Sequence, residues 1–140
     1  MNNSKQYDIL AAVIVLYDDN GRALLQQRTD DAKKLPGYWA FFGGGIEKEE
    51  SPKDAVVRES YEELRVSLVS PKLVLEREFN IKDEQGYMYV FVHPIENKNL
   101  IELHEGQGLG WFFFHEVKYL TMIEHDKEIL EYLFKTDFLG

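Results

Sequence analysis

The sequence predicts a mixed α+β domain, and three observations carry that prediction. Short strand-like segments lie on both sides of a helical segment at about residues 52–64. A second helical pattern covers residues 123–135, where apolar side chains recur at helical spacing. The chain has 140 residues, which suits one domain spanning 1–140. We therefore expect the order β-β-β-α-β-β-β-α, in a mixed sheet with a helix packed on each face.

The expected strands are rich in β-branched, aromatic and other apolar side chains and are separated by Gly, Pro, Asn and Asp. They cover residues 8–17, 22–28, 39–42, 66–79, 87–94 and 111–114. Asn20-Gly21 predicts a hairpin turn between the first two strands. Residues 28–38 and 96–108 read as polar loops, and Pro71 marks an interruption or an edge of the fourth strand.

Composition and charge narrow the classes of function. The formal net charge of −9 argues against binding of polymeric nucleic acid, which depends on phosphate neutralisation by Lys and Arg. The absence of cysteine excludes disulfides and thiolate metal sites. No apolar run reaches the roughly 18 residues of a membrane span, and the first ten residues lack a secretory signal pattern. We therefore expect a cytoplasmic protein with no membrane contact and a small-molecule partner.

The helix at 52–64 carries local start signals. Ser51 can cap it, Pro52 suits its first position, and Asp54 places negative charge in its first turn. Three consecutive glycines, residues 43–45, precede it and allow close approach of a ligand or another segment. A glycine-rich turn alone is weak support for a binding site.

Three acids converge on one side of this helix. Glu59, Glu62 and Glu63 fall at i, i+3 and i+4, so their side chains lie together. Arg58 and Arg65 can each pair with Glu62, and a solvated acidic face is the plain alternative to a metal site. Carboxylates are hard oxygen ligands suited to Mg²⁺ or Mn²⁺.

The segment from Gly43 to Val66 resembles the signature of the Nudix hydrolase family. That signature runs Gly, five residues, Glu, seven residues, Arg-Glu, an apolar residue, any residue, Glu-Glu, any residue, Gly, and an apolar residue. The positions in register here are Gly44, Glu50, Arg58, Glu59, Glu62, Glu63 and Val66. The strand order is also similar to the Nudix fold, a mixed sheet sandwiched between helices (an α/β/α sandwich).

The resemblance implies a metal-dependent pyrophosphohydrolase. Its substrate would be a nucleoside diphosphate linked to another moiety, such as a nucleoside triphosphate or a nucleotide sugar, attacked by water at phosphorus in a monomer or homodimer. The implied ligands of Mg²⁺ or Mn²⁺ are the carbonyl of Gly44 and the side chains of Glu59, Glu62 and Glu63. Arg58 would hold the acids in place and pair with Glu50, and Glu62 and Glu63 would act in catalysis.

A further acid is implied in the loop at 96–108. Glu105-Gly106-Gln107, followed by Trp111, is similar to a stretch of MutT-like members in which an acid supplies another metal ligand or the general base. We expect Glu105 to have this role. Glu102 is the substitute if the loop register differs, and His104 is a further candidate base.

Two positions depart from the signature. Ser60 stands where an apolar residue is usual, and Arg65 stands where glycine is usual. If Arg65 takes the left-handed conformation of that glycine, the strain costs on the order of 1 kcal/mol. Phe42 also replaces the proline that is common before the glycines. These departures keep open a Nudix-fold sensor that binds a nucleotide without hydrolysis. A protein-interaction module with a solvated acidic helix is the third reading.

Substrate-facing residues are harder to identify. Arg28 could meet a phosphate. Aromatic residues that could stack on a base, although they are more often core, are Tyr17, Trp39, Phe79 and Tyr89. MutT-like enzymes place an amide near the start of the last helix to read oxidised guanine, whereas residues 124–126 here are Glu-His-Asp. Oxidised dGTP is therefore not the expected substrate.

Overall fold

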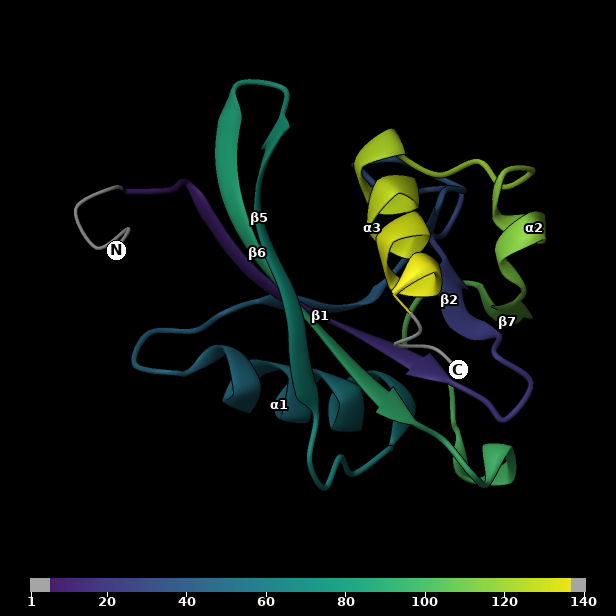
Figure 1. Ribbon diagram of the computed structural model, residues 1–140. Coiled ribbons are helices and arrows are strands. Elements are labelled where there is room, and N and C mark those ends of the chain that lie inside the picture. The colour runs from purple at the N-terminus through teal and green to yellow at the C-terminus, as the bar shows by residue number, and fades with distance from the viewer. Residues whose placement is uncertain (1–5, 137–140) are drawn as a thin grey trace.

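The computed structural model describes residues 6–136, and these form a mixed sheet with α1 on one face and α3 on the other (Figure 1). The elements in chain order are β1 Ile9–Tyr17, β2 Ala23–Gln27, β3 Trp39–Ala40, β4 Phe42–Gly45, α1 Pro52–Leu64, β5 Lys72–Ile81, β6 Glu84–Pro94, the 3₁₀ turn η1 Lys98–Leu100, β7 Gly108–Phe112, α2 Phe114–Val117 and α3 Glu124–Lys135. The predicted class, an α+β sandwich, is confirmed. The ends of the expected 1–140 domain lie outside the described residues.

Strand β1 organises the sheet. The main strand order is β3-β2-β1-β6-β5, while β4 pairs with β1 and β7 pairs with β2. The β1–β6 pair is parallel and the other pairs are antiparallel, so the sheet is mixed as expected. Because β4 lies beside the first half of β1, its glycines are fixed at the level of Ala11 to Val13.

Side-chain alternation along β1 divides the core in two. Val13 and Val15 point to the face covered by α3, where Ile129 is fully buried. Ile14 points to the opposite face and packs with Val56 of α1. Each helix therefore covers one face of the same sheet, and α1 is held against β1 and β4 by its apolar side.

Several element boundaries differ from the sequence prediction. The glycines 43–45 are part of strand β4, because their backbone pairs with β1. The strand expected over 66–79 begins only at Lys72, after Pro71. The strand expected over 111–114 is Gly108–Phe112, since pairing with β2 decides its register, and Phe114 instead begins α2. Within the described residues, no helix is long and apolar enough to cross a membrane.

Candidate active site

The glycines of β4 let the strand and α1 approach each other closely. Gly43 has a φ of 125°, and a side chain there would collide with the carbonyl oxygen of Ala12. A Cβ atom on Gly44 would lie 2.9 Å from Oε1 of Glu59. Glycine therefore allows the carboxylate of Glu59 to rest against the strand backbone, as the sequence pattern led us to expect.

Helix α1 begins and ends as predicted. The Ser51 hydroxyl accepts a hydrogen bond from the N–H of Asp54 at 3.0 Å, and Pro52 is the first helical residue. Arg65 ends the helix with φ 57° and ψ 29°, so it does take the left-handed conformation that glycine would have at this position of the signature. The glutamates of the last two turns are thereby set at fixed positions.

Arg58 organises the acidic cluster. Its guanidinium bonds both oxygens of Glu50, at 2.8 and 3.0 Å, and its hydrogen bonds hold the pKa of Glu50 down at about 2. The same side chain donates to Glu59 at 2.9 Å, to Glu62 at 3.1 Å and to the carbonyl of Gly45 at 3.1 Å. The expected Arg58–Glu50 pair is present, and Arg58 gathers two of the candidate metal ligands.

Glu63 is the most buried acid of the cluster, with 5% of its surface exposed. Its Oε1 accepts the N–H of Gly43 at 2.9 Å. Burial, opposed by that hydrogen bond and helped by the neighbouring charges of Glu59 and Glu105, raises the pKa of Glu63 to about 8. Glu63 is thus a buried carboxylate whose side chain lacks a cationic partner among the residues described.

The loop after β6 brings Glu105 to this cluster. The N–H groups of Glu102 and His104 donate to the carbonyls of Leu64 and Glu63, at 2.9 and 2.7 Å, so the loop docks on the C-terminal end of α1. The side chain of Glu105 interacts with that of Glu63. The carboxylate of Glu102 instead lies 3.7 Å from the His104 ring, and both side chains are exposed. Of the three loop candidates, the geometry favours Glu105.

The site offers carboxylate and carbonyl oxygen atoms, which are the ligand types that a hard divalent cation prefers. Glu59, Glu63 and the backbone of Gly44 lie together, and burial of Glu63 disfavours its ionised form unless a cation is close by. Within residues 6–136, however, no group of three or more His, Asp or Glu side chains is already arranged so that it could hold a metal ion. Arg58 bonds only the Oε1 atoms of Glu59 and Glu62, so each of these carboxylates keeps a second oxygen that could bind an ion.

A small cavity of about 60 Å³ adjoins Glu105. Arg28 lines it, although its Nε donates to the carbonyl of Lys34 at 2.8 Å. Gln26 and Thr29 also line it, and sequence reasoning missed both. Gln26 is buried and donates to the carbonyl of Phe41 at 3.0 Å. The sequence did contain an indication, a glutamine within an apolar strand, because a polar side chain buried in a sheet is unusual and often has a specific role.

The aromatic residues considered for base stacking are mostly structural. Phe79 is buried against the ring of His125, with centroids 5.5 Å apart. Trp39 meets Phe112 edge-on at 4.9 Å, and Tyr17 packs against the core on the α3 side. Tyr89 packs against the core on the α1 side.

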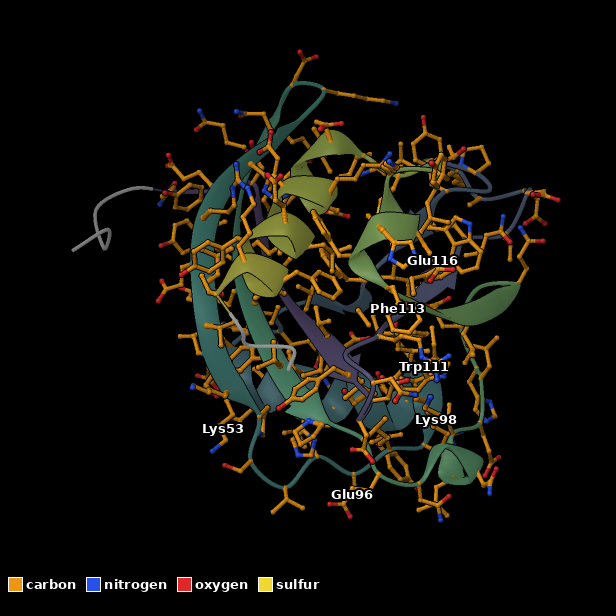
Figure 2. The ribbon with its side chains drawn as sticks, turned by 45° about the vertical axis from the view of Figure 1, so that its right-hand side comes forward. Lys53, Glu96, Lys98, Trp111, Phe113 and Glu116 are labelled. Carbon is orange, nitrogen blue, oxygen red and sulfur yellow. The ribbon has the colours of Figure 1, made fainter. Side chains whose placement is uncertain are left out.

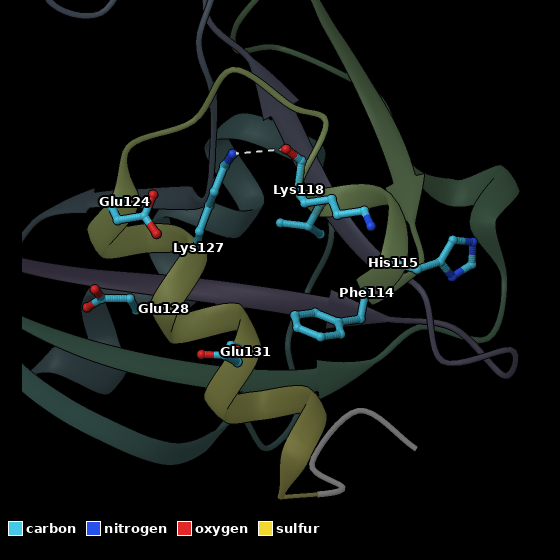
Figure 3. A pocket seen from close by; sticks show the side chains of 8 residues that line it. Phe114, His115, Lys118, Glu124, Lys127, Glu128 and Glu131 are labelled. Atoms are coloured by element: carbon cyan, nitrogen blue, oxygen red, sulfur yellow. Dashed lines mark hydrogen bonds between the residues drawn. The ribbon is translucent and has the colours of Figure 1, made fainter.

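A larger cavity, about 370 Å³, lies between α2 and α3 (Figure 3). Phe114 and Val117 contribute apolar surface to it, and Glu124, Glu128 and Glu131 line its α3 side. It contains none of the acids of α1 or of the Glu105 loop. The candidate active site, where carboxylates, glycine backbone and Arg58 converge, is therefore separate from this larger cavity.

The α/β/α sandwich, the glycine-containing strand β4 and the carboxylates of α1 together form the arrangement that the sequence resemblance implies. The NUDIX domain model matches residues 8–133 of the chain. The chain therefore belongs to the Nudix hydrolase family.

Individual proteins show the same relationship. The chain is 32% identical over 127 residues to the uncharacterized Nudix hydrolase YvcI of Bacillus subtilis (strain 168), covering 86% of this chain and 76% of that protein. It is 28% identical over 127 residues to the CTP pyrophosphohydrolase of Escherichia coli (strain K12), covering 91% and 90%. The crystal structure of the MutT protein from Methanosarcina mazei Go1 has the same fold, with a TM-score of 0.82, 21% identity and coverage of 96% and 97%.

Proposed function

We propose that this chain is a divalent-metal-dependent pyrophosphohydrolase. Its substrate is a nucleoside diphosphate linked to another moiety, of the nucleoside triphosphate or nucleotide-sugar type. The observation that carries the proposal is the environment of Glu63, a buried acid surrounded by Gly43, Glu59 and Glu105 with no cationic partner among residues 6–136. The relationship to a CTP pyrophosphohydrolase supports a nucleotide as the substrate.

Each side chain has a distinct task in this proposal. Glu59, Glu63 and the carbonyl of Gly44 hold Mg²⁺ or Mn²⁺, together with Glu62. A divalent ion held by these groups would supply positive charge to offset the negative charge of the diphosphate and would make water a stronger nucleophile. Arg58, fixed by Glu50, keeps the carboxylates on one side of α1.

Glu105 completes the proposed site. It enters from a different element and lies beside Glu63, so it can take up the proton of the attacking water or add a ligand. Water attack at phosphorus breaks the anhydride bond and leaves two phosphate-containing products, one of them a nucleoside monophosphate or a sugar phosphate.

Hydrolysis assays on the purified chain test the proposal. Nucleoside triphosphates including CTP, ADP-ribose, dinucleoside polyphosphates and nucleotide sugars are each incubated with Mg²⁺, with Mn²⁺ and with EDTA, and phosphate and pyrophosphate release is measured. We expect metal-dependent cleavage of at least one compound, abolished by EDTA. Binding of a nucleotide without cleavage across the panel would contradict it.

A nucleotide sensor without hydrolysis is the second candidate function. It is favoured by the bonds of Arg58 to Glu59 and Glu62, which satisfy two of the acids with a cation of the protein itself. Ser60 and Arg65 also depart from the signature. For a sensor, calorimetry would detect nucleotide binding that is independent of Mg²⁺, and the assays above would detect no product.

A further inference from the structure

A second polar cluster lies away from the acids of α1, in the turn between β1 and β2. Its centre is Asp18, which is 6% exposed. The carboxylate accepts hydrogen bonds from the backbone N–H groups of Asn20 and Arg22, at 3.0 and 2.8 Å. Two cations also bond its Oδ2 atom, Arg22 through Nε at 2.7 Å and Lys98 through Nζ at 2.6 Å. Short charge-assisted bonds of this kind are among the strong ones in proteins.

The two cations are matched in their surroundings. The Nζ of Lys98 lies 4.2 Å from the centroid of the Trp111 ring, and the guanidinium of Arg22 lies 5.5 Å from that of Phe113. Trp111 lies near the end of β7, and Phe113 follows directly after that strand (Figure 2). Each cation therefore combines an ion pair to Asp18 with a contact to an aromatic face.

The two cations differ in the segment that carries them. Arg22 belongs to the same turn as Asp18, so its bond is local. Lys98 begins η1, inside the loop of residues 95–107 that leads to Glu105, and its bond to Asp18 spans 80 residues of sequence. The bond of Lys98 thus ties the start of the Glu105 loop to the sheet.

The rest of this loop runs directly from the tie to the candidate active site. After η1, the N–H groups of Glu102 and His104 dock on α1, and Glu105 follows. Beyond Glu105, the N–H of Gln107 donates to the carbonyl of Gln27 at 2.8 Å. Lys98 supplies a charged side-chain anchor on the N-terminal side of Glu105, where the other tethers named here are backbone hydrogen bonds.

We propose that Lys98 is a positioning residue: by binding Asp18 and Trp111, it sets the path of residues 95–107 and thereby the place of Glu105 beside Glu63. The inference rests on the proposed function, in which Glu105 takes part in hydrolysis. Displacement of a catalytic group by about 1 Å can lower the rate by up to about 10²-fold. Loss of the Lys98 anchor therefore reduces turnover without removing any group that touches substrate.

The test compares Lys98→Met with Arg22→Met, using the nucleotide that the wild-type protein cleaves best. Both substitutions remove one cation from Asp18 Oδ2 and keep an unbranched apolar stem beside the aromatic ring. We expect kcat to fall about tenfold in Lys98→Met with KM changed by less than about twofold, and to stay within about twofold of wild type in Arg22→Met. Lys98→Arg, which keeps the charge, restores most of kcat.

A double-mutant cycle with Glu105→Gln shows whether Lys98 acts through Glu105. We expect Lys98→Met to cause no further loss of kcat in the Glu105→Gln background, because coupled residues are not additive. Equal losses of kcat in Lys98→Met and Arg22→Met, parallel to their losses in Tm, would make Lys98 merely structural. Full activity of Lys98→Met beside an impaired Glu105→Gln would overturn the positioning role alone. Full activity of Glu105→Gln would instead overturn the role of Glu105 in the proposed function.

Discussion

Asp18 and Glu63 are both buried carboxylates, and their surroundings are opposite. Burial would raise the pKa of Asp18, but hydrogen bonds from Lys98 and Arg22 outweigh it and lower that pKa to about 2. Burial and the charges of Glu59 and Glu105 raise the pKa of Glu63 to about 8, because the single hydrogen bond from a backbone N–H is too weak to offset them. Asp18 has its counter-charges built into the fold. Glu63 lacks them, which is the expected condition of a group that receives a cation in function.

The substitution Glu63→Gln tests the functional half of this comparison and has the largest expected effect. The amide keeps the size of the side chain but removes a ligand charge, so we expect kcat to fall by about 10²-fold or more. The Tm of the metal-free protein should stay the same or rise, because the amide is neutral without the proton uptake that burial imposes on the Glu63 carboxyl group. Steady-state kinetics and thermal unfolding measure the two effects.

Glu131→Gln provides the matched control, since Glu131 is an exposed acid of α3 on the other side of the sheet. It should leave kcat unchanged. If Glu63→Gln kept wild-type turnover, Glu63 would have no part in the mechanism.

Asp18→Asn tests the structural half. Removing the charge weakens the bonds of Lys98 and Arg22, and we expect a loss of about 2 kcal/mol in the free energy of unfolding at pH 7. The pKa of Asp18 is about 2 in the folded protein against 3.8 as reference, so its ionised form stabilises the fold above about pH 4. That contribution is lost as the pH falls through 2.

Urea unfolding of both proteins between pH 7 and pH 2 measures this dependence. The difference between wild type and Asp18→Asn should shrink as the pH falls below 4. Asp19→Asn, at the exposed neighbour in the same turn, serves as the control and should stay within about 0.5 kcal/mol of wild type. A constant difference across the whole range would show that ionisation of Asp18 does not stabilise the fold.

Ser60 is a third buried polar side chain, and it has fewer hydrogen-bond partners than Asp18 or Glu63 among residues 6–136. It is fully buried on α1, and within residues 6–136 its hydroxyl has no hydrogen-bond partner. Ser60→Ala removes the unsatisfied hydroxyl and favours the helix, so we expect a gain of about 1 kcal/mol by thermal or urea unfolding. Ser67→Ala, at an exposed position, should give no comparable gain. A loss of stability in Ser60→Ala would mean that the hydroxyl is satisfied in solution.

Arg65 gives the smallest expected effect. Its left-handed backbone costs about 1 kcal/mol, while its side chain donates to the carbonyls of Tyr61 and Glu62 at 2.9 and 3.1 Å. These terms oppose each other, so Arg65→Gly should gain only about 0.5 kcal/mol. Arg65→Ala loses the bonds and keeps the strain, and it should be less stable than Arg65→Gly by about 1 kcal/mol. Equal stability of the two variants would show that the strain is absent.

What the sequence could predict follows from how local each feature is. The bounds of α1 and the conformation of Arg65 were predictable, because caps and helix ends depend on neighbouring residues. The Arg58–Glu50 pair was predictable from the family signature. The last strand was predicted with shifted bounds: Trp111 and Phe112 do lie in β7, but pairing with β2 extends the strand back to Gly108 and ends it before residues 113–114.

The features that were missed depend on contacts between distant segments. Nothing near Asp18 or Lys98 in the sequence shows that they bond across 80 residues. The choice of Glu105 over Glu102 was stated from the resemblance, and it needed the docking of the loop on α1 to gain geometric support. Gln26 is recognisable in the sequence as a polar residue in an apolar strand. Its place beside Glu105 and Gly106, however, depends on how the distant loop folds back onto β2.

Calorimetric titration with Mn²⁺ tests most directly whether the acids of α1 bind a divalent cation. Wild-type protein is compared with the double variant Glu59→Gln/Glu63→Gln under the same conditions. We expect saturable binding heat in the wild type that is lost in the variant, with both proteins folded by circular dichroism. The same binding heat in both proteins would contradict it.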